Sequence, residues 1–207
     1  MDFADLHLPH VPQFVEFGMA GTIDWAIVQA TAVTGNVRIC LTAGVEITST
    51  IVKHARRIFL ELDSASTPRL SEMHDIAMLP PPPDRGPIAI MHAMHRVGLP
   101  NASVDPSKVV GVVHTNEPTY AVPFSAPSET HPRSGHHIMA FLTSELKSDW
   151  LPPEMLPVQA GVGNVSNAVE ATIGALPHLA DFMMFMEVMQ DLQVNLLESG
   201  SIRGVST

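Results

Sequence analysis

Short apolar runs alternate with polar segments through the first half of the chain. Runs of this length that are rich in β-branched residues and flanked by Gly or Pro are typical of buried strands. Such runs occur at residues 23–30, 37–41, 58–62, 88–91 and 109–113. Helical spacing of apolar positions predicts helices between them, at residues 12–17 and 46–57. This alternation predicts an α/β fold of packed layers with a mostly parallel sheet.

The pattern is interrupted at residues 117–133, which hold four prolines, several Ser and Thr residues and no periodic apolar face. This composition is typical of an interdomain linker. We therefore expect one α/β domain at residues 1–116 and a second at residues 134–207. The second domain is expected to open with a helix that Ser134 caps. Its apolar face, at helical spacing, comprises Ile138, Phe141, Leu142 and Leu146.

A strand, a tight glycine loop and a helix are predicted next. The apolar run at residues 157–160 precedes a Gly-x-Gly turn, and apolar positions recur at helical spacing over residues 165–173. Glu170 is expected on the surface of this helix. A further apolar run at residues 182–188 predicts another strand. A helix ended by Gly200 and a final strand at residues 202–206 then complete the second α/β unit.

Two features of this unit are candidates for chemistry. The loop Gly161, Val162, Gly163 and Asn164 lies between a strand and a helix start, an arrangement that aims backbone N–H groups at a negative oxygen. Glu187 is the single acid in its apolar run. A carboxylate at the carboxyl end of a buried strand is costly to desolvate, which favours a catalytic role. The alternative interpretation is a Glu at a strand edge that faces water.

These residues also carry a resemblance to a known family. The stretch Gln159-Ala-Gly-Val-Gly-Asn-Val-Ser-Asn-Ala-Val169, followed by Glu187-Val-Met-Gln-Asp191, resembles the paired signature of the acetyl-CoA hydrolase/transferase family. Upstream motifs occur in the family's order: Asp5-Leu-His-Leu-Pro-His-Val-Pro-Gln13, Met73-His-Asp-Ile76 and Pro83-Asp-Arg-Gly-Pro-Ile88. The resemblance covers essentially the whole chain, and the bacterial succinyl-CoA:acetate CoA-transferases are especially similar.

The resemblance implies the fold of class I CoA-transferases, in which two α/β domains meet at the active site. Residues 1–116 would be the C-terminal part of the first domain, and residues 134–207 the N-terminal part of the second. Glu187 matches the family's catalytic glutamate, and the N–H of Val162 matches one oxyanion donor. Two departures stand out. Met186 replaces the usual hydroxyl residue, and the family's later glycine-rich element has no counterpart, so we expect a central fragment truncated at both ends.

The implied function is CoA transfer between an acyl-CoA of the acetyl or succinyl type and a small carboxylic acid, through a glutamyl-CoA thioester. Hydrolysis of acetyl-CoA by the same glutamate is equally compatible. CoA would be a substrate, no cofactor is implied, and the complete protein would be a homodimer. The alternatives are an inactive partial chain of such an enzyme or, from another class, a metal-binding module.

Composition narrows the function classes. The 207 residues are 45% hydrophobic and 15% charged, which is typical of a globular protein. A net charge of −10 leaves no basic stripe for a nucleic acid and disfavours an anionic membrane. Cys40 is the only cysteine, which excludes an internal disulfide and fits a reducing compartment. We expect a cytoplasmic protein, or a mitochondrial one if the source is eukaryotic, with no membrane span.

The metal-binding alternative depends on 11 histidines and 12 methionines. Met91-His-Ala-Met-His95 places soft and borderline ligands close together. However, a closed site needs three or four converging ligands, and no spacing here enforces that. Met91 is also at the end of an apparent buried strand, where methionine usually fills space. We therefore expect no metal at His92 and His95.

Overall fold

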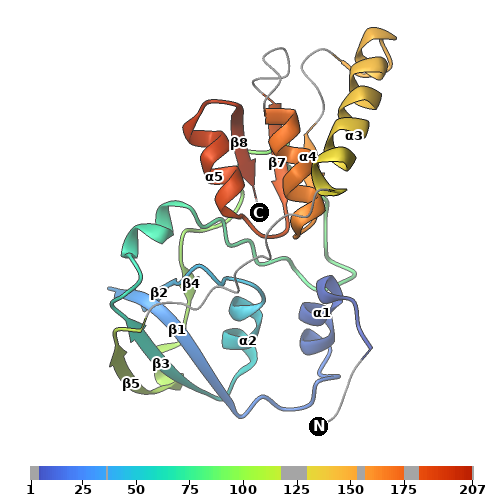
Figure 1. The fold of residues 1–207 in the computed structure, drawn as a ribbon. Helices are drawn as coiled ribbons and strands as arrows, with labels where there is room; N and C mark the ends of the chain where they lie inside the picture. The colour runs from blue at the N-terminus through green and yellow to red at the C-terminus, as the bar shows by residue number, and fades with distance from the viewer. Residues whose placement is uncertain (1–4, 36, 118–129, 153–156, 175–181, 207) are drawn as a thin grey trace. The chain divides into compact units, whose positions relative to one another are not determined.

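The computed structural model of the protein describes residues 5–35, 37–117, 130–152, 157–174 and 182–206. It divides into two compact units. Unit 1 comprises Met1–Ala89 and Arg96–Tyr120, and unit 2 comprises Ile90–His95 and Ala121–Thr207. Figure 1 shows the elements of each.

Unit 1 contains a mixed five-stranded sheet. Its strands are β1 Trp25–Thr34, β2 Arg38–Leu41, β3 Arg57–Asp63, β4 Ala102–Ser103 and β5 Val109–Thr115, in the order β4-β2-β1-β3-β5. β3 pairs in parallel with β1 on one side and with β5 on the other, whereas the β1–β2 hairpin and the β2–β4 pair are antiparallel. The helices are α1 Val11–Glu16 and α2 Thr48–His54, and short 3-10 turns occur at Leu8–His10, Pro68–Glu72 and Pro106–Lys108.

Alternation along β1 determines which face of this sheet is covered. Ala26 and Val28 are buried against α2, whereas Ile27 between them is 77% exposed on the opposite face. This is the period of two that a strand imposes on its side chains. The buried cluster of unit 1 lies on the covered face and is listed here: Ala26, Val28, Ala30, Ile39, Leu41, Val52, Ala55, Ile58, Leu60, Ala102 and Val104.

Three details of the first half of the chain differ from the sequence predictions. Residues 88–91 form no strand, and Met91 is 82% exposed, because the segment follows Pro87 and pairs with no neighbouring strand. The strand predicted at residues 109–113 exists as β5, but it is not buried. It is an edge strand of the sheet, and Val110 and Val112 are about half exposed. The predicted helix 46–57 is shorter, because Ala55 is extended and Arg57 already pairs with Trp25 of β1.

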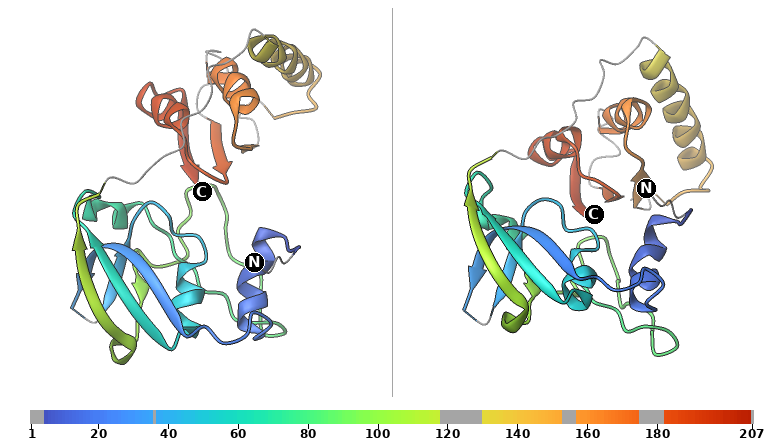
Figure 2. Two further views of the ribbon diagram at one scale, coloured as in Figure 1. Left: turned by 60° about the horizontal axis from the view of Figure 1, so that its bottom comes forward. Right: turned by 90° about the horizontal axis from the view of Figure 1, so that it is seen from below.

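Unit 2 is a parallel three-stranded sheet with helices. Its elements are α3 Thr130–Lys147, β6 Val158–Ala160, α4 Asn164–Gly174, β7 Phe182–Met186, α5 Asp191–Glu198 and β8 Ile202–Ser206. The strand order is β6-β7-β8, and both pairings are parallel. α4 lies between α3 and α5 in Figures 1 and 2. The expected α/β class with mostly parallel pairing is confirmed, since four of the six strand pairs described are parallel.

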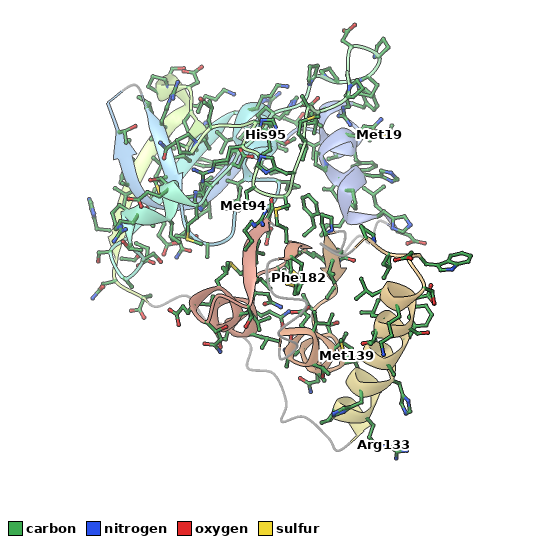
Figure 3. The ribbon with its side chains drawn as sticks, turned by 90° about the horizontal axis from the view of Figure 1, so that it is seen from above. Met19, Met94, His95, Arg133, Met139 and Phe182 are labelled. Atoms are coloured by element: carbon green, nitrogen blue, oxygen red, sulfur yellow. The ribbon has the colours of Figure 1, made fainter. Side chains whose placement is uncertain are left out.

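The core of unit 2 joins the helices to the central strand. Met184 of β7 is fully buried, and Met139 and Phe182, labelled in Figure 3, belong to the same cluster. The cluster is completed by Ile173, Met186, Leu196 and Ile202. Methionine is common here because its unbranched side chain fills irregular space.

The start of α3 was predicted wrongly. The helix begins at Thr130 rather than at Ser134. Pro132 therefore lies in the first turn, where a missing N–H costs no intrahelical hydrogen bond. Of the predicted linker 117–133, residues 118–129 lie outside the described residues, and the division into domains at 1–116 and 134–207 stays a prediction.

Candidate active site

The loop between β6 and α4 is built around a glycine. Gly163 has φ +139°, a backbone conformation that residues with a Cβ rarely adopt. α4 begins at the next residue, and its hydrogen-bond ladder starts with the N–H of Asn167 donating to the carbonyl of Gly163 at 3.0 Å. The amides of Val162 and Gly163 therefore precede the helix, at the end where the helix dipole is positive. The predicted strand, loop and helix are confirmed at this position.

The register of the sheet brings this loop and Glu187 to one edge. Ala160 at the end of β6 pairs with Met186 at the end of β7, and the two strands are parallel. Gly161 and Glu187 are the next residues of each strand, so the chain leaves the sheet at both points side by side. Adjacent strands lie about 4.8 Å apart. The structure thus brings together the two features that the sequence singled out.

The environment of Glu187 differs from the expectation. β7 ends at Met186, and Glu187 is an exposed residue of the following bend rather than an acid inside a buried strand. The argument from costly desolvation therefore does not apply to this carboxylate. Met186 is buried, and its side chain belongs to the core of unit 2. The nucleophilic role of Glu187 and the oxyanion role of Val162 stay predictions.

Glu170, predicted on the helix surface, is instead buried in this unit. Its side chain is 1% exposed and accepts a hydrogen bond from Nε2 of Gln193 in α5. Burial raises the pKa of the Glu170 carboxyl, and the hydrogen bond from Gln193 partly offsets that rise. Sequence periodicity missed this residue because the face of α4 that carries it is covered by another helix rather than by solvent.

In the histidine and methionine segment, the two histidine rings contact their own segment, whereas the side chain of Met94 lies against Gly204 of β8. The rings of His92 and His95 stack with centroids 5.5 Å apart. Nδ1 of His92 accepts from the N–H of Met94 at 3.2 Å, and Nδ1 of His95 accepts from the N–H of Met91 at 3.3 Å. Among the residues that the structure describes, no group of three His, Cys, Asp or Glu side chains is arranged to hold a metal ion. No helix within the described residues has the length and hydropathy needed to cross a membrane.

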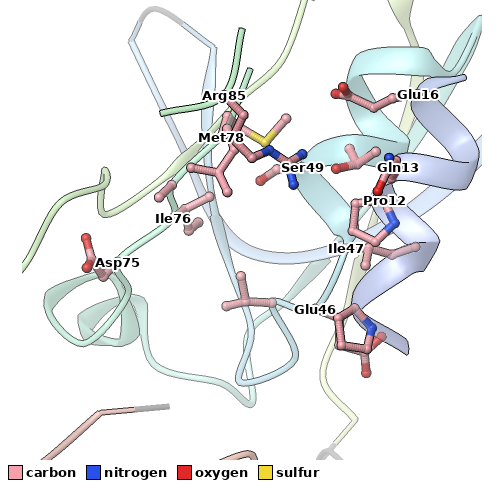
Figure 4. Close-up of a pocket in the computed structure, with 15 residues that line it drawn as sticks. Pro12, Gln13, Glu16, Glu46, Ile47, Ser49, Asp75, Ile76, Met78 and Arg85 are labelled. Atoms are coloured by element: carbon pink, nitrogen blue, oxygen red, sulfur yellow. The ribbon is translucent and has the colours of Figure 1, made fainter. Parts of the chain in front are cut away.

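Unit 1 holds a cavity that sequence reasoning did not foresee. Its volume is about 330 Å³, and Figure 4 shows its lining. Gln13, Asp75 and Arg85, which line it, come from the three upstream motifs quoted above. Glu16 also lines it and pairs with Nζ of Lys53 at 2.8 Å, an interaction that lowers the pKa of the Glu16 carboxyl. Motifs that are far apart in sequence therefore converge on one cavity.

Comparison with known proteins places these features in a family context. The model of the acetyl-CoA hydrolase/transferase N-terminal domain matches residues 1–114. Over 206 residues the chain is 39% identical to the propanoyl-CoA:succinate CoA transferase of Escherichia coli K12, and the alignment covers 100% of the chain and 42% of that relative. It is 31% identical over 204 residues to the succinyl-CoA:acetate CoA-transferase of Clostridium kluyveri, covering 99% of the chain and 38% of that protein.

An acetyl-CoA hydrolase of Schizosaccharomyces pombe is 34% identical over 211 residues, covering 98% of the chain and 40% of the relative. The chain thus spans about two fifths of the length of these curated relatives. Among solved structures, RipA from Yersinia pestis matches with a TM-score of 0.61 at 19% identity, over 97% of this chain and 36% of that one.

The 4-hydroxybutyrate CoA-transferase of Porphyromonas gingivalis matches with a TM-score of 0.59 at 16% identity, over 96% of this chain and 40% of that one. At these identities the structural matches show the fold.

Proposed function

Because the chain belongs to the acetyl-CoA hydrolase/transferase family, we propose that it carries the nucleophile of a CoA-transfer reaction and that this nucleophile is Glu187. One observation carries the proposal. The pairing of Ala160 with Met186 puts the glycine loop and Glu187 at the same edge of the sheet, one residue beyond the last pair. A carboxylate and a loop of backbone amides at one sheet edge are the two parts that attack on a thioester requires.

The first step needs no general base. The carboxylate of Glu187 attacks the thioester carbonyl of the acyl-CoA, and the carbonyl electrons move to its oxygen. That oxyanion is stabilised by the N–H of Val162, an effect worth about 3 kcal/mol per donor in comparable sites. The tetrahedral intermediate collapses when the C–S bond breaks, leaving an acyl-glutamyl anhydride and CoA thiolate. The exposure of Glu187 suits this step, because the carboxylate is accessible to a large substrate.

Transfer then proceeds through the enzyme itself. CoA thiolate attacks the glutamyl carbonyl of the anhydride, which releases the first carboxylate and leaves a glutamyl-CoA thioester. The acceptor carboxylate attacks this thioester, and the thiolate returns to the new acyl group to regenerate Glu187. Each step exchanges one acyl bond for another, so no oxidant or external proton source is required.

The fate of the anhydride decides between the two activities. If water is excluded, a carboxylic acid accepts CoA, whereas if water enters, the same glutamate supports hydrolysis. Relatives with either name match this chain at similar identity. We propose acetyl-, propanoyl- or succinyl-type acyl groups with a small carboxylic acid as acceptor. The homodimer that the family resemblance implies stays a prediction.

Trapping the glutamyl thioester tests the proposal. The chain is incubated with acetyl-CoA and reduced with borohydride, and residue 187 is examined by peptide mass for conversion of its carboxyl group to an alcohol. Glu187→Gln should abolish the modification. The matched control is Glu198→Gln, an exposed glutamate at the end of α5, which should leave the modification intact.

A chimera supplies the kinetic test. The 206 residues of the Escherichia coli relative that align with this chain are replaced by this sequence, and acyl exchange is measured. Glu187→Gln should lower kcat on the order of a thousand-fold or more, because the reaction loses its nucleophile. Sustained exchange with residue 187 unmodified would refute the mechanism.

A further inference from the structure

We propose that Glu170, Gln193 and Gln190 form a buried link between α4 and α5 that positions Glu187 relative to the glycine loop. The inference rests on the proposed function and extends it to three residues that do not touch the substrate. All three side chains are almost fully buried in unit 2, with exposures of 1%, 0% and 8%. They are positioning residues in this proposal, because they act by holding the backbone that carries Glu187 and the glycine loop.

The link is a chain of two hydrogen bonds. Nε2 of Gln193 donates to Oε2 of Glu170, so α5 is joined to α4. Oε1 of the same Gln193 accepts from the backbone N–H of Gln190 at 2.8 Å. One amide group therefore holds a helix at one end and the residue before α5 at the other. Because the amide is planar, and because its nitrogen donates while its oxygen accepts, it fixes the orientation of Gln190 relative to Glu170.

Each end of the link leads to one half of the candidate site. Glu170 lies in α4, which starts directly after Gly163. Gln190 closes the short bend that begins at Glu187, immediately before α5. The two hydrogen bonds therefore connect the glycine loop, through α4 and α5, to the bend that carries Glu187. A shift at Glu170 would move the bend that carries Glu187 relative to the loop.

Packing alone does not explain a carboxylate in this place. α4 and α5 already approach closely, since a Cβ added at Gly174 would lie 2.2 Å from Cδ2 of Leu196. Among the described residues, Oε1 of Glu170 has no hydrogen-bond partner. A buried carboxylate that is only partly satisfied costs stability relative to an apolar residue of similar size. A group retained at such a cost is better explained by the orientation it imposes than by stability.

Four variants separate the hydrogen-bond pattern from the burial. Glu170→Gln keeps an acceptor oxygen for Gln193. Glu170→Leu fills the space but leaves Nε2 of Gln193 without its partner. Gln193→Glu brings two carboxylates together and removes the donor. The double variant E170Q/Q193E restores both bonds, because Gln at 170 donates to Glu at 193, which still accepts from the N–H of Gln190.

Steady-state kinetics of CoA transfer in the chimera described above are the main readout. Glu170→Leu and Gln193→Glu should lower kcat by about 10- to 100-fold with KM changed less than about threefold, as misplacement of a reacting group does. The double variant should recover kcat to near the Glu170→Gln value. The matched control, Glu198→Leu on the exposed side of α5, should leave kcat unchanged. Unchanged kcat in Glu170→Leu, or no recovery in the double variant, would overturn the proposal.

Hydrogen exchange at the Gln190 amide distinguishes failure of the link from failure of the proposed function. This amide should exchange faster in Glu170→Leu and return to the wild-type rate in E170Q/Q193E, without any substrate present. Full activity in Glu187→Gln would refute the proposed function while leaving this result intact. Exchange at Gln190 that is indifferent to residue 170 would refute the link, whatever the activity of Glu187→Gln.

Discussion

Substituting the two glycines of the candidate oxyanion loop, Gly161 and Gly163, by alanine should change the stability of the protein to different extents. Gly163 has φ +139°, whereas Gly161 lies outside the left-handed region. At both positions an added Cβ would meet no other atom within 4 Å, so neither variant creates a clash with the surroundings. The pair therefore isolates backbone strain from packing, within one loop and with one chemical change.

The magnitude follows from this geometry. Holding a residue with a Cβ in a sparsely populated backbone region costs about 1–3 kcal/mol. Loss of backbone freedom in the unfolded chain stabilises either alanine variant by about 0.4–1 kcal/mol. This second effect is common to both variants and cancels in their difference. Gly163→Ala should therefore be less stable than Gly161→Ala by about 1–3 kcal/mol.

Local opening can be measured by hydrogen exchange at the Asn167 amide. This N–H donates to the carbonyl of Gly163 and forms the first turn of α4, so its exchange reports on the loop. A difference of 1–3 kcal/mol corresponds to an exchange rate about 5- to 150-fold faster in Gly163→Ala than in Gly161→Ala. Urea unfolding followed by circular dichroism should rank the variants in the same order. Equal stability of the two variants would refute the assignment of the strained turn to Gly163.

Two further predictions concern unit 1. Ile58→Ala should destabilise the protein by about 2–5 kcal/mol in urea unfolding, because the Ile58 side chain is fully buried. Ile88 is 41% exposed in a segment without a strand, so Ile88→Ala should change stability by less than about 0.5 kcal/mol. Similar losses in the two variants would contradict the fold. The N–H of Ala65 and the hydroxyl of Ser66 hold the pKa of Asp63 below its usual 3.8. Its contribution to stability is therefore present above pH 3.8 and lost as the pH falls through the lowered pKa, so Asp63→Asn should flatten the acid limb of the stability curve, and an unchanged limb would contradict this.

The strands and helices near the candidate site were predictable because local patterns specify them. The apolar run, Gly-x-Gly turn and helical spacing give β6, the loop and α4 directly. Gly163 is recognisable because a conformation with positive φ demands glycine whatever surrounds it. The errors occurred where local signals are weak. Residues 88–91 have the composition of a strand but no neighbouring strand to pair with. For α3, both Thr130 and Ser134 are residue types that can begin a helix, and the helix begins at Thr130.

The sequence by itself determined the class of fold, the family and the residue types at the loop and at Glu187, since these depend on periodicity and on ordered motifs. Tertiary structure alone decided what surrounds each residue. Strand register puts Gly161 beside Glu187, and the end of β7 leaves Glu187 exposed rather than buried. Packing of α5 on α4 turns Glu170 from an expected surface residue into a buried one. The physical reason is that burial of a side chain depends on which other element packs against it. Periodicity along one element shows only which of its faces is apolar.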